Sequence, residues 1–137
     1  MGFTFPGVLY SSEAPGEVPK VHTPASGNVE RKVLLDAIRA EVKEMHGLDV
    51  IFVVKEMNVS DGWAWVHALP RSRDGSCLYE DLYALLRREK SEWMVAEMPC
   101  TEPDNSECID SPDYFRNIVA RYPDMPVTIL PKESARD

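Results

Sequence analysis

The clearest pattern along the chain is an apolar stripe that runs between Asn28 and Gly47. Apolar residues recur there every three or four positions, as they do on one face of a helix, at Leu34, Ala37, Ile38, Val42 and Met45. Asn28 is a favourable N-cap residue, and Gly47 is a favourable residue just past the last turn. The pattern therefore predicts a helix that ends at about residue 46.

A first β-hairpin is predicted directly after this helix. Val50–Val59 is rich in branched apolar residues, and Trp63–Leu69 returns as a second strand. Asp61 and Gly62 between them form the dipeptide that favours a tight two-residue turn.

A second hairpin is predicted from Leu82–Arg87 and Trp93–Met98, with its turn around residues 89–91. The alternative is a helix over Tyr79–Glu89, whose Leu, Ala, Arg and Glu residues all have good helix propensity. A short helix is then predicted over Pro112–Arg121, capped by Ser111.

The two ends of the chain differ from the part between them. Residues 1–27 contain four prolines and four glycines, which favours an extended arm, and residues 123–137 are predicted to be an extended tail. Residues 28–122 form the predicted domain. Its fold class is α+β, with a long N-terminal helix packed on a curved four-stranded antiparallel sheet and a short C-terminal helix.

Side-chain alternation in the strand after Asp61-Gly62 separates small residues from large ones. Successive side chains of a strand point to opposite faces. The small side chains of Ala64, Val66 and Ala68 suit close approach of the helix. The other face then carries the candidate binding residues Trp63, Trp65, His67 and Leu69. That face is either open to a partner or covered by a loop, the arm or the C-terminal segment.

Charge and hydropathy exclude two classes of protein. The net charge of −8 argues against nucleic-acid binding, which requires clustered Lys and Arg. The longest apolar run, Val50–Val54, is far too short to span a bilayer. Phe3–Tyr10 does not form the apolar core of a signal peptide, because Pro6 interrupts it and no basic residue precedes it. We therefore expect the signal peptide of a secreted protein to lie before residue 1.

Two of the three cysteines, Cys100 and Cys108, are separated by an acidic, turn-forming segment. Zinc sites use closer cysteine pairs with further ligands nearby, so no metal site is predicted. The spacing favours a disulfide between Cys100 and Cys108, which would persist only in an oxidising compartment. The alternative is a pair of free thiols in a cytosolic loop. Cys77 is predicted to be a partly buried free thiol.

Two groups of side chains are candidates for acid–base chemistry. Asp36 and Arg39 are three residues apart on the predicted helix and are expected to pair, either in a cleft or as a surface ion pair. His67 is a candidate base with Asp61 or Glu97 as its partner, although a single strand histidine is more often structural. No Ser-His-Asp order is visible, and no cofactor is predicted.

Several segments resemble a family of uncharacterised bacterial envelope proteins. These segments are "RKVLLDAIRAEV", "VIFVVKEMNVSDGWAWVHALP" and "YALLRREKSEWMVAEMPC", and the likeness covers roughly residues 28–122. The matching residues are Arg31, Leu34, Leu35, Asp36, Ala37, Ile38, Arg39, Phe52, Val53, Val54, Gly62, Trp63, Ala64 and Trp93. The order of helix and strands is also similar to cystatin-like and nuclear transport factor 2-like folds. Neither resemblance implies an activity.

The sequence therefore predicts a non-catalytic binding module that is periplasmic or secreted. Its expected partner is a protein, a peptide or an envelope component, bound through the sheet face that carries Trp65. The alternative is a small enzyme with a pocket of the nuclear transport factor 2 type, which uses His67 and a carboxylate.

Overall fold

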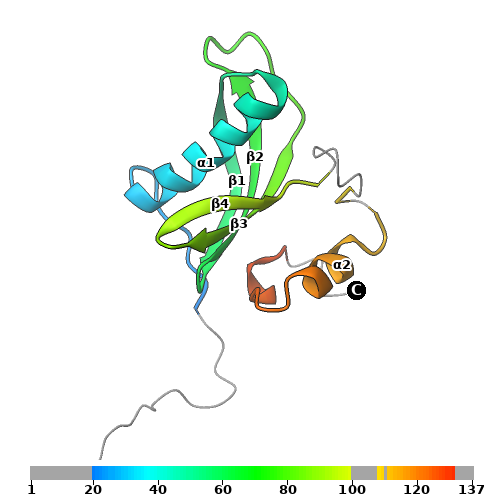
Figure 1. Cartoon of the computed structure of the whole chain (residues 1–137). Coiled ribbons are helices and arrows are strands. Elements are labelled where there is room, and N and C mark those ends of the chain that lie inside the picture. Colours follow the sequence, from blue (N-terminus) through cyan, green and yellow to red (C-terminus); the bar gives the residue numbers. More distant parts are fainter. Residues whose placement is uncertain (1–19, 100–107, 110, 132–137) are drawn as a thin grey trace, which may run out of the picture.

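The computed structural model describes residues 20–99, 108–109 and 111–131 and has the predicted α+β architecture (Figure 1). A helix packs on a four-stranded antiparallel sheet, and a short second helix follows. The elements are α1 (Val29–His46), β1 (Val50–Ser60), β2 (Trp63–Ser72), β3 (Leu82–Glu89), β4 (Glu92–Glu97), α2 (Tyr114–Arg121) and the 3-10 helix η2 (Val127–Ile129).

Local capping fixes both ends of α1, which is 18 residues long. The Asn28 side-chain oxygen accepts a hydrogen bond from the Glu30 backbone N–H at 2.8 Å. Gly47 has a left-handed backbone (φ 69°), and its N–H donates to the Lys43 carbonyl at 2.8 Å. The predicted helix boundaries are therefore confirmed.

The sheet order is β1-β2-β3-β4, so every strand pairs with its neighbour in sequence. Asp61 and Gly62 turn the chain between β1 and β2 with positive φ values of 54° and 80°. Lys90 and Ser91 do the same between β3 and β4, with φ values of 52° and 70°. The predicted second hairpin is confirmed, and the alternative helix over residues 79–89 does not form.

One core lies between α1 and the sheet. Leu34, Ile38 and Val42 of α1 are buried against a set of buried sheet residues that includes Ala64, Val66 and Ala68. The three sheet residues lie on the α1 side, as the alternation in β2 predicts.

A second core lies on the other side of the sheet, where α2 and η2 cover it (Figure 1). Its buried members are Trp63, Trp65, Leu85, Tyr114, Ile118, Met125, Ile129 and Leu130. Residues 123–131, expected to be part of an extended tail, therefore belong to the packed domain. Their apolar side chains pack on the tryptophans of β2.

The start of α2 also differs from the prediction. The helix begins at Tyr114 with Asp113 in the cap position, and Asp113 makes no capping hydrogen bond with its side chain. Ser111, expected as the cap, instead accepts a hydrogen bond on its hydroxyl from the Cys108 N–H at 3.3 Å. The hydroxyl is therefore used upstream of the helix rather than within it.

The described part of the predicted arm is attached to the sheet. His22 and Val59 exchange two backbone hydrogen bonds, of 2.9 and 2.8 Å, at the outer edge of β1. Pro24 is buried, and its carbonyl accepts a hydrogen bond from Arg31 at 3.0 Å. The segment from His22 onward is therefore part of the domain, whereas residues 1–19 lie outside the described residues.

Candidate functional site

The predicted binding face is divided into a covered end and an accessible end. Trp63 is 7% exposed and Trp65 is 0% exposed, because α2 and η2 lie over them. The rings of Trp65 and Phe115 meet edge to face with centroids 5.8 Å apart. Of the two alternatives, the structure has the covered one, and the tryptophans themselves form no open surface.

The other end of the same face remains partly accessible. Leu69 is half-buried and pairs in register with Val53 of β1, which is 37% exposed. Ile51, two residues before Val53, lies on the same face and is also half-buried. Because β1 is an edge strand, these side chains form an apolar strip at the rim of the sheet.

His67 borders this strip and has a carboxylate partner that the sequence did not indicate. Its Nε2 lies 2.7 Å from Oδ2 of Asp81, just before β3. Its ring stacks on Tyr83, with centroids 4.2 Å apart and an interplanar angle of 19°. The expected partners Asp61 and Glu97 are used elsewhere: Asp61 lies in the β1–β2 turn, and Glu97 bonds α2.

Glu97 is a buried carboxylate that attaches α2 to the sheet. It is 3% exposed, accepts a hydrogen bond from the Tyr114 hydroxyl at 2.8 Å, and pairs with Arg121 through Nε at 3.1 Å and Nη2 at 2.5 Å. Tyr114 and Arg121 both belong to α2, so the Glu97 carboxylate holds the covering segment on the sheet.

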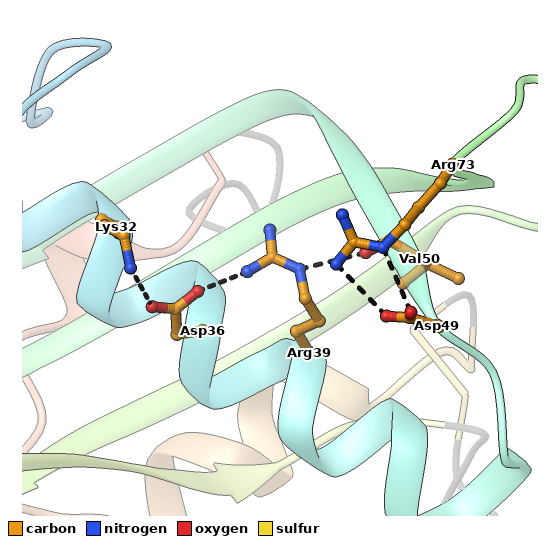
Figure 2. Close-up of polar contacts among 6 residues, drawn as sticks. All are labelled: Lys32, Asp36, Arg39, Asp49, Val50 and Arg73. Atoms are coloured by element: carbon orange, nitrogen blue, oxygen red, sulfur yellow. Dashed lines mark hydrogen bonds and ion pairs between the residues drawn. The ribbon is translucent and has the colours of Figure 1, made fainter.

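The predicted pair of Asp36 and Arg39 is confirmed and belongs to a chain of surface contacts (Figure 2). Asp36 also accepts a hydrogen bond from Lys32 at 2.8 Å, which is the main cause that lowers the pKa of the Asp36 carboxyl. Arg39 Nε donates to the Val50 carbonyl at 3.0 Å and so joins α1 to β1.

Arg73 binds both carboxylate oxygens of Asp49, at 3.1 and 3.3 Å (Figure 2). Its hydrogen bonds lower the pKa of Asp49.

A cavity of about 400 Å³ lies beside the start of α1. Arg31, Lys32 and Arg39 line it, but each already has a partner in the structure.

A second cavity, of about 280 Å³, lies where the C-terminal end of α1 meets the sheet. Its wall includes the apolar side chains of four buried residues, Val42, Val50, Leu82 and Met98. Its polar lining residues include His46, Tyr79, Glu80 and Asp81. The sequence pattern does not reveal this cavity, because its lining residues come from four separate stretches of the chain.

In the described part of the chain, the residue types that commonly bind metal ions are not grouped into a site. Cys77 is free and exposed, not partly buried as expected. Cys108 is half-buried, and Cys100 lies outside the described residues, so the bridge between them stays a prediction. Among residues 20–99, 108–109 and 111–131, no three His, Cys, Asp or Glu residues are grouped as metal ligands.

None of the described helices combines the length and the apolar character needed to cross a membrane. No family model, no curated protein and no solved structure matches the chain. The resemblance to envelope proteins therefore stays a prediction.

Proposed function

We propose that the protein is a non-catalytic binding module that contacts a partner protein through the accessible end of its second sheet face. The observation that carries the proposal is the apolar strip of Ile51, Val53 and Leu69. It lies beside the hydrogen-bonded pair of His67 and Asp81, so apolar contact area is combined with polar groups that orient a partner.

The strip lies on paired strands of the sheet rather than on a loop. Leu69 lies on a central strand, and the same face is packed at its other end by the second core. A partner that covers Val53 and Leu69 gains apolar burial without having to order a loop.

Site-specific photocrosslinking tests the surface directly. A photoreactive amino acid at Val53 is expected to give a discrete crosslinked adduct in cells that make the protein. The matched position is Val33 on α1, which is similarly exposed, at 41% against 37%. The adduct should be absent from position 33 and should be lost when Leu69→Asp is added to the Val53 probe. The same adducts from both positions, or none from position 53, would contradict the proposal.

We propose further that the module works in the bacterial envelope, as a periplasmic or secreted protein with a bond between Cys100 and Cys108. The support is the spacing of the cysteines and the resemblance of residues 28–122 to envelope proteins. Thiol counting on the denatured, unreduced protein should find one reactive thiol, that of Cys77. A count of three reactive thiols would show that the disulfide is absent, and the argument for this compartment would then fail.

A second candidate function rests on the 2.7 Å contact between His67 and Asp81. A carboxylate that orients an imidazole is the arrangement of a general base. If the pair has this role, the protein hydrolyses p-nitrophenyl acetate faster than free imidazole does. His67→Gln then abolishes the excess rate, and His46→Gln, at an exposed histidine, leaves it intact. Equal rates for the parent and His67→Gln would eliminate the enzyme hypothesis.

A further inference from the structure

The cavity between the C-terminal end of α1 and the sheet combines an apolar wall with an acidic mouth. Val42 comes from the last turns of α1, Val50 begins β1, and Leu82 begins β3. Met98 and Pro99, directly after β4, complete the apolar wall. The wall is therefore built from elements of the first core and has a fixed shape.

The cavity has the size of a small molecule or of one large side chain. Its volume is about 280 Å³. Because a water molecule occupies about 30 Å³ of liquid, this space corresponds to roughly nine waters. A chain of about six carbons with one polar head, or a single aromatic ring with a short arm, fits such a volume.

Apart from His46, the ionised side chains that line the cavity are of one sign. Of the described residues that line the cavity, Glu80 and Asp81 are acidic, and none is Lys or Arg. Asp81 is bonded to His67, whereas Glu80 is exposed and has no ion pair or hydrogen bond among the described residues. An exposed carboxylate beside an apolar cavity attracts a cation and repels an anion, and the net charge of −8 acts in the same direction.

We infer that this cavity binds a small amphiphilic cation, in which an apolar group fills the wall of Val42, Val50, Leu82 and Met98 and a protonated amine lies at Glu80. This site is separate from the strip of Ile51, Val53 and Leu69, so the inference goes beyond the proposed function. The apolar part supplies most of the affinity, and Glu80 selects the sign of the charge.

Calorimetric titration with simple ligands tests both halves of the inference. The probes are butylamine, pentylamine and hexylamine, with hexanol and hexanoate as the neutral and anionic counterparts. The amines should bind one per chain, and each added methylene should strengthen binding about three- to fourfold. Hexylamine should bind more tightly than hexanol, and hexanoate more weakly than either.

Two pairs of variants assign the binding to the cavity. Glu80→Gln should weaken hexylamine about two- to fivefold, the range for an exposed ion pair, and should leave hexanol unchanged. Glu92→Gln, at an exposed acid of β4 outside the cavity, should have no effect. Leu48→Trp inserts a ring at the half-buried Leu48 of the lining and should weaken all three amines, whereas Leu78→Trp, at a residue that is 69% exposed and outside the cavity, should not.

Three outcomes would overturn the inference. Hexanoate or hexanol that binds as tightly as hexylamine removes the selection for a cation. Affinity that does not depend on chain length removes the apolar half. Leu48→Trp that binds like Leu78→Trp, with both variants folded by circular dichroism, places the ligand outside this cavity. The crosslinking test at Val53 does not involve these residues, so either proposal can fail while the other stands.

Discussion

Removal of the Trp65 side chain tests whether the second core contributes to the stability of the domain. Trp65 is fully buried, and the rings of Phe115 and Tyr83 lie against it, with centroids 5.8 and 6.1 Å away. Trp65→Ala deletes the largest side chain of this core and leaves a cavity under α2.

The cost follows from burial and packing. Truncation of a buried Trp or Phe to Ala destabilises a protein by about 3–5 kcal/mol, which is a large part of a total stability of about 5–15 kcal/mol. Trp65→Phe should cost much less, about 1–2 kcal/mol, because it retains an aromatic ring and removes a donor. The Trp65 indole N–H is buried without a hydrogen-bond partner among the described residues.

Urea unfolding followed by far-ultraviolet circular dichroism measures both variants without relying on tryptophan fluorescence. For a urea slope of about 1.5 kcal/mol per M, Trp65→Ala should lower the midpoint by roughly 2–3 M. Trp93→Ala is the matched control, because Trp93 on β4 is half-buried, and it should cost about 1–2 kcal/mol. A midpoint for Trp65→Ala within about 0.5 M of the parent, at an unchanged slope, would show that α2 and η2 do not pack on this face in solution.

Three further predictions follow from single contacts. Arg121→Ala leaves the buried Glu97 carboxylate without its cation and should cost about 2–3 kcal/mol in urea unfolding, whereas Arg116→Ala on the exposed side of α2 should cost under about 1 kcal/mol. Ile38→Asp puts a charge into the first core and should leave most of the protein unfolded, as measured by circular dichroism. Arg39→Ala loses the hydrogen bond to the Val50 carbonyl and should cost only about 1–2 kcal/mol. Similar losses of stability from the two substitutions would mean that Ile38 does not lie on the buried face of α1. Hydrogen bonds from the Ser76 backbone and from the Ser72 and Ser76 hydroxyls lower the pKa of Asp74 to about 2, so an NMR titration should find its midpoint there. Because the folded pKa is below the ordinary value of 3.8, the stabilisation of this loop is complete above pH 4 and is lost as the pH falls toward 2; a midpoint near 3.8 would mean that these bonds do not form.

The parts of the fold that local signals determine could be predicted from the sequence. Asn28 and Gly47 set the two ends of α1 through contacts within one turn of the helix, and Asp61-Gly62 determines the first hairpin. The two faces of β2 follow from the alternation of side chains alone. The second hairpin lacks such a signal, because Lys90 and Ser91 adopt the positive φ that glycine usually supplies, and the sequence therefore also allows a helix over residues 79–89.

The remaining features depend on contacts between distant segments. Residues 123–131 contain three prolines and no regular periodicity, so the burial of Met125 and Ile129 becomes visible only when Trp63 and Trp65 provide a surface. The partner of His67 depends on the register of β2 with β3, which places His67 opposite Tyr83 and therefore near Asp81. Sequence alone does not determine that register.

The position of η2 near the end of the described chain has a consequence during synthesis. The four strands are complete once residue 97 has been made, but Leu130, the last buried residue of the second core, comes 33 positions later. At about 5–20 residues per second, the ribosome needs roughly 2–7 seconds to add that segment. Until the segment has emerged from the ribosome, Trp63, Trp65 and Leu85 lack the side chains that cover them in the folded domain, and we expect chaperones to bind the nascent chain at this stage. A premature stop codon between Arg121 and Leu130 would make the interval permanent and would produce an aggregating protein rather than a shortened but working one.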